Sequence, residues 1–339
     1  MQRNMIITKA PVRISLGGGG TDLPSYYEKR EGFLIAGAIN KYVFVGANMQ
    51  FYKDIILKYS SIEKVPCVHK INHTLFREAL KLYSIRDKIE LTSLADIPAG
   101  TGLGSSGAFL VALLNTLHMY KYHSLPLKRV VAEEACTIEL DILKEHEGKQ
   151  DKYACAFGDI YGYKFHKSGK VDVIPLINND ITREHLRQHL LLFFTGIRRE
   201  KRAGEVLKYQ DEKCKKDDSR MFQYLDDIKA IGLETKSAFE EGRYDYFGTL
   251  LNKHWIIKKK YNPYASNEFI DKCYDVALNK GALGGKLIGA GDGGFLMFYH
   301  PGPQKQIWGF LDAMKGCGLT HMDYQFDTEG VQTIMEEDG

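Results

Sequence analysis

Three glycine-rich segments restrict what this chain can fold into more than any other feature of its sequence. They read GGGGTD at residues 17–22, PAGTGLGSSG at 98–107 and GGKLIGAGDGG at 284–294. Each glycine held in an ordered backbone loses more conformational entropy on folding than other residues do, so clusters this dense are unfavourable in loops that only connect two elements. The sequence therefore predicts that these segments bring backbone close to a ligand.

The middle segment contains the pattern G-x-G-x-x-G through Gly102, Gly104 and Gly107. A Rossmann dinucleotide loop would follow a buried parallel strand directly, whereas Pro98 and Ala99 separate this loop from a strand that alternates apolar and polar residues. A Walker A loop requires a lysine that the segment lacks. Two alternatives remain: an anion site built from backbone amides and the N-terminus of the next helix, or an ordinary Gly/Ser connection that caps that helix.

The length of 339 residues predicts two domains. The charged stretch at 177–189 is the expected boundary, which gives an N-terminal nucleotide-binding domain at 1–182 and a C-terminal domain at 183–339 that completes the active-site cleft. Residues 109–120 are apolar all round, which predicts a buried central helix. Other helices are expected at 72–83, from Pro126 to Gly148, within 200–280 and at 303–315, and strands at 6–16, within 33–48 around a turn, at 55–60, 89–95, 190–195 and near Gln325.

Composition narrows the functions that this chain can have. The 46 basic and 43 acidic residues give a net charge of +3, too little for the broad cationic field of a nucleic-acid binder. The six cysteines are widely spaced and predict reduced thiols. No segment approaches the ~20 apolar residues of a membrane span. We expect a cytoplasmic enzyme with a small-molecule substrate, no nucleic acid and no membrane as partners, and a homodimer stays open.

Together, the segments APVRISLGGGGTDLP, PAGTGLGSSGAFLVALL and KLIGAGDGGFLMF resemble, in type and order, the three signature motifs of the GHMP kinases. The resemblance implies an α+β fold with an N-terminal domain like domain 2 of ribosomal protein S5 and a ferredoxin-like C-terminal domain. It also implies ATP and Mg²⁺ as cofactors and an alcohol as phosphoryl acceptor. The form GGGGTD and the run EHEGKQDKYACAFGD are most similar to the sugar-kinase branch, in particular to kinases of D-glycero-D-manno-heptose 7-phosphate. That similarity implies phosphorylation of the anomeric hydroxyl to give a 1,7-bisphosphate.

The family motifs also imply roles for single residues. Asp151 matches the catalytic aspartate, and Arg13 the basic residue beside it that stabilises the nucleophile or the transferring group. Ser106 and Glu139 match the magnesium ligands. Without the resemblance, Asp151 and Ser106 could equally cap helices, and Arg13 and Glu139 could be exposed. The residues expected to hold the phosphates of ATP are Pro98, Gly100, Gly102, Leu103, Gly104, Ser105, Ser106 and Gly107.

On the acceptor side, Asp22 resembles the aspartate that binds sugar hydroxyls in galactokinases, although an Asx turn would also explain it. A phosphorylated acceptor needs donors for its distal phosphate, and Arg198, Arg199 and Arg202 are the expected group. The other expected acceptor residues are Gly18, Gly19, Gly20, Thr21, Gln150, Lys286, Gly291 and Asp292. Two further functions stay open: a kinase of an unphosphorylated sugar such as fucose or galactose, and a non-catalytic sensor of ATP and sugar.

Overall fold

The computed structural model describes residues 5–177, 179–197, 203–291 and 293–336, with the backbone alone at 203–206 and 335–336. Its described strands form one sheet of eight and one of four. The larger sheet has the order β12-β1-β2-β5-β3-β4, and β6 and β7 extend it beside β2. Its strands are β1 (Ile6–Gly17), β2 (Gly32–Met49), β3 (Ile55–Lys58), β4 (Ile62–Val65), β5 (Ile89–Ala95), β6 (Ile160–Phe165), β7 (Val171–Pro175) and β12 (Gln332–Glu336).

The antiparallel pair β1 and β2 forms the centre of this sheet. Their register shifts between Pro11 and Val12, where proline lacks the N–H that a regular ladder needs. β2 pairs with β5 along its second half and with β6 along its first half. The predicted turn within 33–48 is therefore wrong, because this interval belongs to a single strand of 18 residues.

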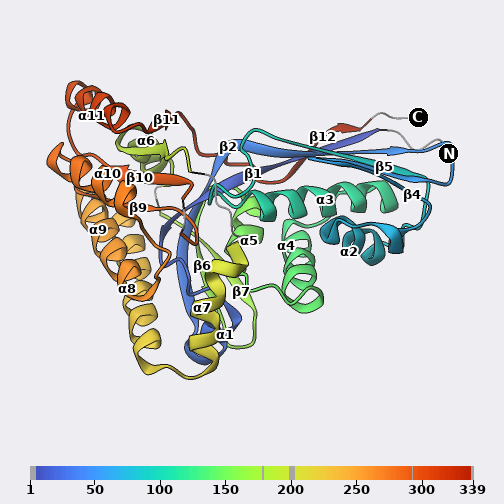
Figure 1. Cartoon of the computed structure of the whole chain (residues 1–339), viewed down its shortest axis with the longest axis horizontal. Coiled ribbons are helices and arrows are strands. Elements are labelled where there is room, and N and C mark those ends of the chain that lie inside the picture. The colour runs from blue at the N-terminus through green and yellow to red at the C-terminus, as the bar shows by residue number, and fades with distance from the viewer. Residues whose placement is uncertain (1–4, 178, 198–202, 292, 337–339) are drawn as a thin grey trace.

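Helices cover one face of the larger sheet (Figure 1). The predicted apolar helix is α3 (Ser105–Tyr122), which packs on β1 and β2 and is buried along most of its length. Its neighbours are α2 (Thr74–Leu82), α4 (Lys128–Cys136) and α5 (Gln150–Phe157). Helix α3 is thus fixed in the core of the protein from Gly107 onward, as the all-round apolar sequence predicted.

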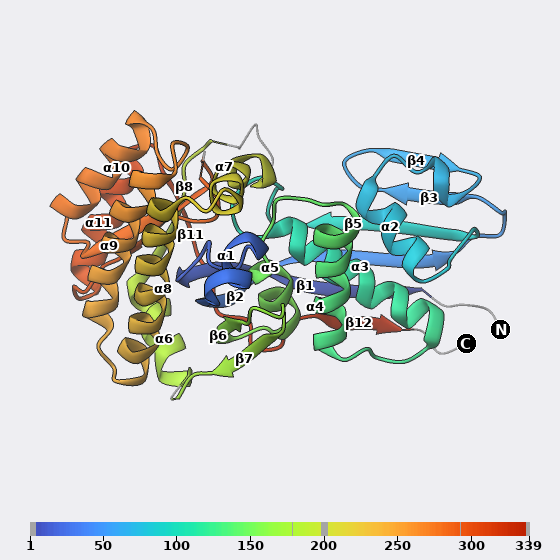
Figure 2. The same ribbon diagram turned by 90° about the horizontal axis from the view of Figure 1, so that it is seen from below.

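The second sheet is antiparallel, with the order β11-β8-β10-β9, and helices pack against it (Figure 2). Its strands are β8 (Leu190–Phe194), β9 (Gly284–Leu287), β10 (Phe295–Tyr299) and β11 (Thr320–Met322). The helices in contact with it include α6 (Asn179–His189), α9 (Tyr244–Tyr261) and α11 (Gln304–Gly316), and α10 (Glu268–Asn279) packs on α11. Helix α8 (Ser219–Glu240) packs on α9 and on β1 and β2 of the larger sheet, and α7 (Ala203–Lys215) packs on α1 (Pro24–Arg30) and α8. The chain then returns to the first sheet, where β12 pairs with β1. The predicted division after residue 182 stays a prediction.

Two more predicted elements differ from the structure, and one hairpin was not predicted. The helix expected up to Gly148 stops being α-helical at Cys136, and a π-helical turn, Thr137–Ile142, follows it. No strand contains Gln325, although Phe326 makes a single bridge to Ile39. The hairpin of β6 and β7 was not predicted, although Ser168-Gly169 in the connection between the two strands is typical of a turn.

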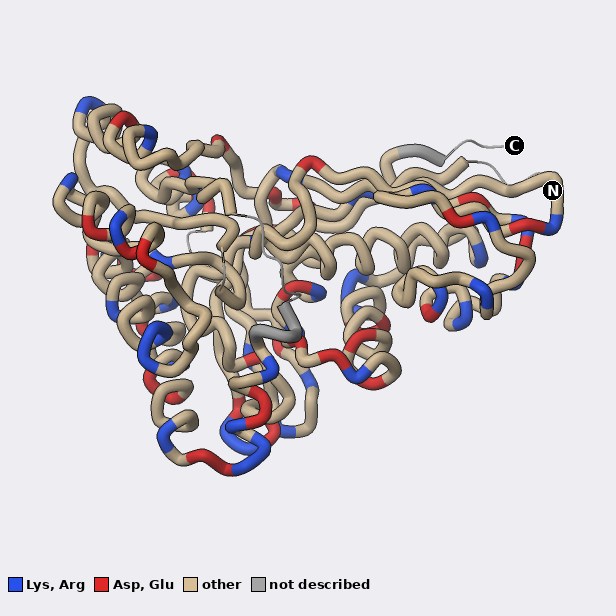
Figure 3. Tube along the Cα trace, in the orientation of Figure 1, with Lys and Arg blue, Asp and Glu red and all other residues tan. Residues whose placement is uncertain are grey.

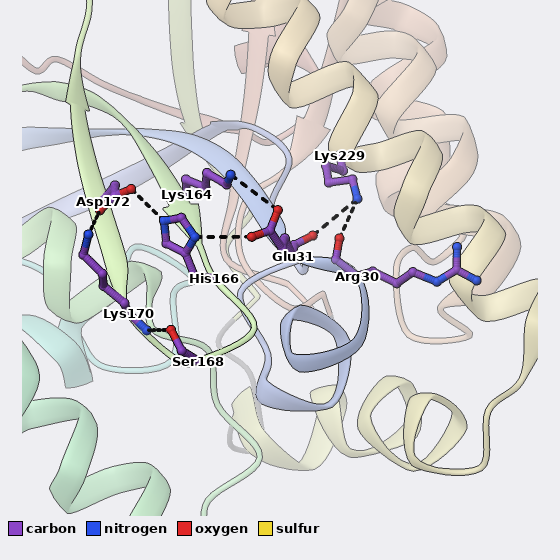
Figure 4. A network of polar contacts seen from close by, with 8 residues as sticks. All are labelled: Arg30, Glu31, Lys164, His166, Ser168, Lys170, Asp172 and Lys229. Carbon is purple, nitrogen blue, oxygen red and sulfur yellow. Dashed lines mark hydrogen bonds and ion pairs between the residues drawn. The ribbon is translucent and has the colours of Figure 1, made fainter.

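A surface network ties this hairpin to the rest of the protein (Figure 4). His166 lies between two carboxylates, 3.2 Å from Glu31 and 2.6 Å from Asp172. From α8, Lys229 donates to the carbonyl oxygens of Arg30 and Glu31, at the end of α1 (Pro24–Arg30). Elsewhere, basic and acidic residues alternate along the surface (Figure 3). None of the helices in the described ranges is long and apolar enough to cross a membrane.

Candidate active site

The three glycine-rich segments meet at one cleft of about 720 Å³. One wall comes from β1, the loop that follows it and the segment before α5, and the opposite wall from α9 and β9. The N-terminus of α3 lies between these walls. The backbone segments that the sequence marked as close to a ligand therefore surround a single cavity.

The loop before α3 has the features of an anion site. Gly104 adopts a left-handed conformation with φ of 78° as the residue before the helix, which a residue with a Cβ rarely adopts. The helix N-terminus contributes roughly half a positive charge. Arg13 holds the loop in place, because its Nη1 donates to the Gly102 carbonyl at 2.6 Å and its backbone N–H to the Leu103 carbonyl at 2.9 Å. The Ser105 hydroxyl is buried and has no hydrogen-bond partner among the described residues.

Two of the predicted phosphate-loop residues do not line the cleft. The side chain of Leu103 is fully buried in the hydrophobic core. The carbonyl of Pro98 accepts a hydrogen bond from the Thr101 hydroxyl at 3.1 Å, which shapes the loop. The loop residues that line the cleft are Ala99, Gly100, Gly102, Gly104, Ser105, Ser106 and Gly107.

Arg13 and Asp151, 138 positions apart in the sequence, form an ion pair at the floor of the cleft. Arg13 Nε and Nη2 both approach Asp151 Oδ1, at 2.7 and 2.6 Å. Asp151 lies in the first turn of α5 and is 20% exposed, and Arg13 is 7% exposed. Because Arg13 occupies one oxygen, Oδ2 is the atom that can accept a proton from a ligand in the cleft.

The two residues predicted to bind magnesium lie together. The Ser106 hydroxyl donates to Glu139 Oε1 at 3.3 Å, and Glu139 is buried. Glu139 lies in the π-helical turn after α4, and it follows the buried residues Ala135 and Cys136 by four and three positions, so it continues the buried face of that helix. One carboxylate and one hydroxyl fit Mg²⁺ in a kinase site, where phosphates and water usually complete the coordination.

Lys152 is an unpredicted part of this arrangement. It is buried, forms an ion pair with Glu139 Oε2 and donates to the Gly148 carbonyl at 3.0 Å. Burial alone lowers the pKa of Lys152, but the nearby carboxylates of Glu139 and Glu147 outweigh burial, so the pKa is raised and the ammonium stays charged. Burial raises the pKa of Glu147 to about 8 despite the proximity of Lys152.

Asp22 and its neighbours form the acceptor side of the cleft. The Asp22 carboxylate accepts hydrogen bonds from the backbone N–H groups of Gly20 at 3.2 Å and Gln150 at 2.9 Å. Burial raises the pKa of this carboxyl. A Cβ on Gly148 would lie 1.9 Å from Asp22 Oδ2, so the glycine is required there. The Thr21 hydroxyl is buried and bonds to the backbone of Gly18 and Phe33, which gives it a part in the loop's structure.

Two buried polar atoms on this side have no partner among the described residues. They are Ser15 Oγ, which the sequence did not single out, and Gln150 Nε2. Both residues line the cleft, and a Cβ on Gly19 would lie 2.6 Å from Ser15 Oγ, so a larger residue there would cover the hydroxyl. A ligand with several hydroxyl groups would satisfy both atoms.

The wall from α9 and β9 is basic. Lys286 lies on β9 and is 3% exposed, and His254 and Lys258 lie one turn apart on α9, both buried. Gly291 has a positive φ of 134° and packs against the carbonyl of Tyr264, outside the cleft lining. The predicted residues Arg198, Arg199, Arg202 and Asp292 lie outside the described residues.

The sequence analysis did not predict the residues that line the far end of the cleft. It is lined by Tyr59, Asn72, His73, Thr74 and Leu75. Glu63 fixes this segment, because its carboxylate accepts hydrogen bonds from the backbone N–H groups of Asn72 and His73 and from the Tyr59 hydroxyl. No sequence motif contains these residues. Tyr59 and His73 are 14 positions apart in the sequence, and folding brings their rings into an edge-to-face contact with centroids 4.8 Å apart.

The model of the GHMP kinases N terminal domain matches residues 68–159, and that of the GHMP kinases C terminal domain matches residues 235–315. The chain belongs to the GHMP kinase family. This kinase is 29% identical to D-glycero-alpha-D-manno-heptose 7-phosphate kinase of Campylobacter jejuni, over 97% of this chain and 98% of that protein. It is 26% identical to the galactokinase of Pyrococcus furiosus, over 85% of this chain and 87% of that protein.

Solved structures have the same fold. The structure of a D-glycero-D-manno-heptose 1-phosphate kinase from Bacteroides thetaiotaomicron superposes with a TM-score of 0.80 at 24% identity, over 98% of this kinase and 100% of that chain. The galactokinase of Lactococcus lactis in complex with galactose superposes with a TM-score of 0.78 at 18% identity, over 97% and 95% of the two chains. The predicted family, the two-domain fold and the assignment as a phosphotransferase are confirmed. GHMP kinases use ATP as phosphate donor, generally with Mg²⁺.

Proposed function

We propose that this GHMP kinase transfers the γ-phosphoryl group of ATP to the anomeric hydroxyl of D-glycero-D-manno-heptose 7-phosphate and releases ADP and the 1,7-bisphosphate. The observation that carries the choice of acceptor is the match to the Campylobacter enzyme along nearly the whole length of both chains. The unsatisfied polar atoms of Ser15 and Gln150 beside Asp22 support a hydroxyl-rich acceptor at this position.

In this proposal, the residues of the chain supply positioning and charge. Asp151 Oδ2 accepts the proton of the anomeric hydroxyl as its oxygen bonds to the γ-phosphorus and the bond to the β–γ bridging oxygen breaks. Arg13 holds Oδ1, so it keeps Asp151 oriented and places positive charge beside the phosphoryl group during transfer. The backbone amides at the start of α3 bind the phosphates.

Two further sites are proposed, one for Mg²⁺ and one for the adenine base of ATP. Mg²⁺ bound at Ser106 and Glu139 would neutralise charge on the phosphate oxygens. Lys152 prevents Glu139 from being an unpaired buried carboxylate before the metal arrives. The aromatic end of the cleft at Tyr59 and His73 is the proposed site of the adenine base, since flat rings favour contacts with aromatic side chains.

The test is ADP release from MgATP with heptose 7-phosphate, free heptose, fucose, galactose and mevalonate as separate acceptors. Turnover concentrated on heptose 7-phosphate, and lost in Asp151→Asn, supports the proposal. Faster turnover of a free sugar would retain the kinase and replace the acceptor. Binding of ATP and sugar without turnover of any acceptor would favour the sensor.

A further inference from the structure

The cleft contains a buried lysine, Lys286, that has no partner in the described part of the chain. Four of the basic residues that line it are Arg13, Lys152, Lys258 and Lys286. The first two are paired with Asp151 and Glu139. Lys258 donates to the carbonyl oxygens of Leu287 and Gly289. Lys286 has no hydrogen bond or ion pair within the described residues, although its side chain is almost completely buried.

A buried ammonium without a partner is costly unless a ligand supplies the missing charge. Burial and the nearby Arg13 lower the pKa of Lys286 to about 7, so part of the population is neutral when the cleft is empty. Beside it, His254 Nδ1 is buried and has no hydrogen-bond partner among the residues that the structure describes. Its pKa lies well below the usual value because of burial, Lys286 and Lys258, so its ring is neutral. These groups favour an anion with several acceptor oxygens.

The position of this basic wall assigns the anion to the acceptor. His254, Lys258 and Tyr261 lie at spacings of four and three residues, on one face of α9. Tyr261 reaches the acceptor loop, because a Cβ on Gly20 would lie 3.6 Å from the Tyr261 hydroxyl. The ATP phosphates already have the amides at the start of α3. The basic wall, which reaches the acceptor loop through Tyr261, is therefore left for an anionic group of the acceptor.

We propose that Lys286, with His254 beside it, binds the phosphate of the acceptor sugar at the end opposite the reacting hydroxyl. The proposal rests on the proposed function, and it places this phosphate within the described cleft instead of at Arg198 and Arg199. Lys286 is then the residue that distinguishes a phosphorylated sugar from a free one. Its ammonium donates to phosphate oxygens and recovers full charge on binding.

The test compares Lys286→Met with the wild type on heptose 7-phosphate and on free heptose. Methionine keeps most of the length and volume of the buried stem and removes the charge. We expect kcat/KM for heptose 7-phosphate to fall about 10- to 100-fold, mainly through KM, because a charge-assisted contact to phosphate is lost. Free heptose has no phosphate for Lys286 to bind, so we expect kcat/KM for free heptose to fall much less than kcat/KM for heptose 7-phosphate.

The controls separate a specific role from a general loss. Lys260→Met removes an exposed lysine from the same helix, α9, and should leave both activities unchanged. Lys286→Arg keeps the charge and should retain most of the preference for the phosphorylated sugar. Calorimetric titration with heptose 7-phosphate without ATP should show the same loss of affinity in Lys286→Met, and its thermal unfolding reports whether the variant is folded.

Each outcome decides the question. An equal loss on both acceptors would overturn the proposal, because Lys286 would then act on the transferring group. The proposal would also be overturned if Lys286→Met still preferred heptose 7-phosphate over free heptose and the double variant Arg198→Gln/Arg199→Gln did not. The proposed function would stand in that case. If the wild type does not use heptose 7-phosphate at all, the proposed function itself fails together with this assignment.

Discussion

Replacing Gly107 by alanine tests the placement of Asp151 without removing a reacting group. Gly107 lies in the first turn of α3, and a Cβ there would be 2.6 Å from Asp151 Cβ and 3.3 Å from its carbonyl carbon. Carbon atoms in favourable contact lie about 3.5–4.0 Å apart. The start of α5 must therefore shift by about 1 Å, and a change of side-chain rotamer cannot relieve the contact because Cβ and the backbone are involved.

The expected size of the effect follows from this displacement. A shift of about 1 Å at a reacting group costs about 100-fold in rate. The bonds of 2.7 and 2.6 Å between Arg13 and Asp151 would lengthen at the same time. Overpacking destabilises by about 1–3 kcal/mol, and the better helix propensity of alanine offsets up to about 1 kcal/mol of that. We expect kcat to fall about 100-fold with a modest loss of thermal stability.

Steady-state ADP release and thermal unfolding measure the two effects. The matched control is Gly309→Ala, since Gly309 lies inside α11 and a Cβ there meets nothing within 4 Å. That variant should keep the wild-type kcat and be slightly more stable. A folded Gly107→Ala protein with kcat within twofold of the wild type would refute the argument that Asp151 reacts from its present position.

Three other predictions concern charged groups of the cleft. Asp151→Asn should lower kcat by about 100- to 10,000-fold with little change in the KM for ATP, measured by ADP release. Glu139→Gln should raise the Mg²⁺ concentration for half-maximal activity at least about tenfold, and it should destabilise the protein by about 3 kcal/mol because Lys152 loses its partner. The double variant Glu139→Gln/Lys152→Met should regain the stability but not the response to Mg²⁺. Because the pKa of Lys286 is about 7, the fraction of Lys286 that is charged falls as the pH rises from 7 to 8. The KM of the wild type for heptose 7-phosphate should therefore increase about fivefold over this range, whereas the KM of Lys286→Arg should not change.

The sequence predicted the backbone of the site better than its side chains. Glycine clusters mark positions where a Cβ cannot fit, and this requirement is local, so the loops could be recognised before the fold was known. The pairing of Arg13 with Asp151 across 138 residues followed from the family motifs, and the structure joins them at 2.7 Å. Helix α3 was predicted because its apolar residues occur all round the helix.

The missed residues are polar side chains whose burial depends on distant parts of the chain. Lys152 was not singled out, and the burial of Lys286, an expected acceptor residue, was not predicted, because lysine is mostly exposed and no periodicity distinguishes a buried lysine from an exposed one. Glu139 was predicted from the family motif, but its contacts with Ser106 and Lys152 join it to residues outside its own helix, which no local pattern predicts. Ser15 lies on β1 between Ile14 and Leu16, and this local sequence does not indicate a polar site. Only the folded structure shows that its hydroxyl lines the cleft without a hydrogen-bond partner among the described residues.

The backbone contacts between the second and third glycine segments around the cleft give the site a fixed length. Gly294 has a positive φ of 100°, and a Cβ there would lie 2.0 Å from the Thr101 carbonyl oxygen. The Thr195 N–H and hydroxyl both donate to the Gly294 carbonyl, at 3.0 and 2.8 Å. The phosphate loop that contains Thr101 is therefore packed directly against the loop that follows β9, which carries Lys286.

This fixed distance predicts selection by acceptor length as well as by charge. If the phosphate is held at Lys286 while the anomeric hydroxyl meets Asp151, a hexose 6-phosphate falls short by on the order of 1 Å, which costs about 100-fold in rate. Its phosphate carries the same charge, so charge alone would give equal rates. Comparing kcat/KM for mannose 6-phosphate and heptose 7-phosphate separates the two explanations. Equal values would show that the cleft closes around either acceptor, and that the contact between Gly294 and Thr101 does not set the distance between the two ends of the substrate.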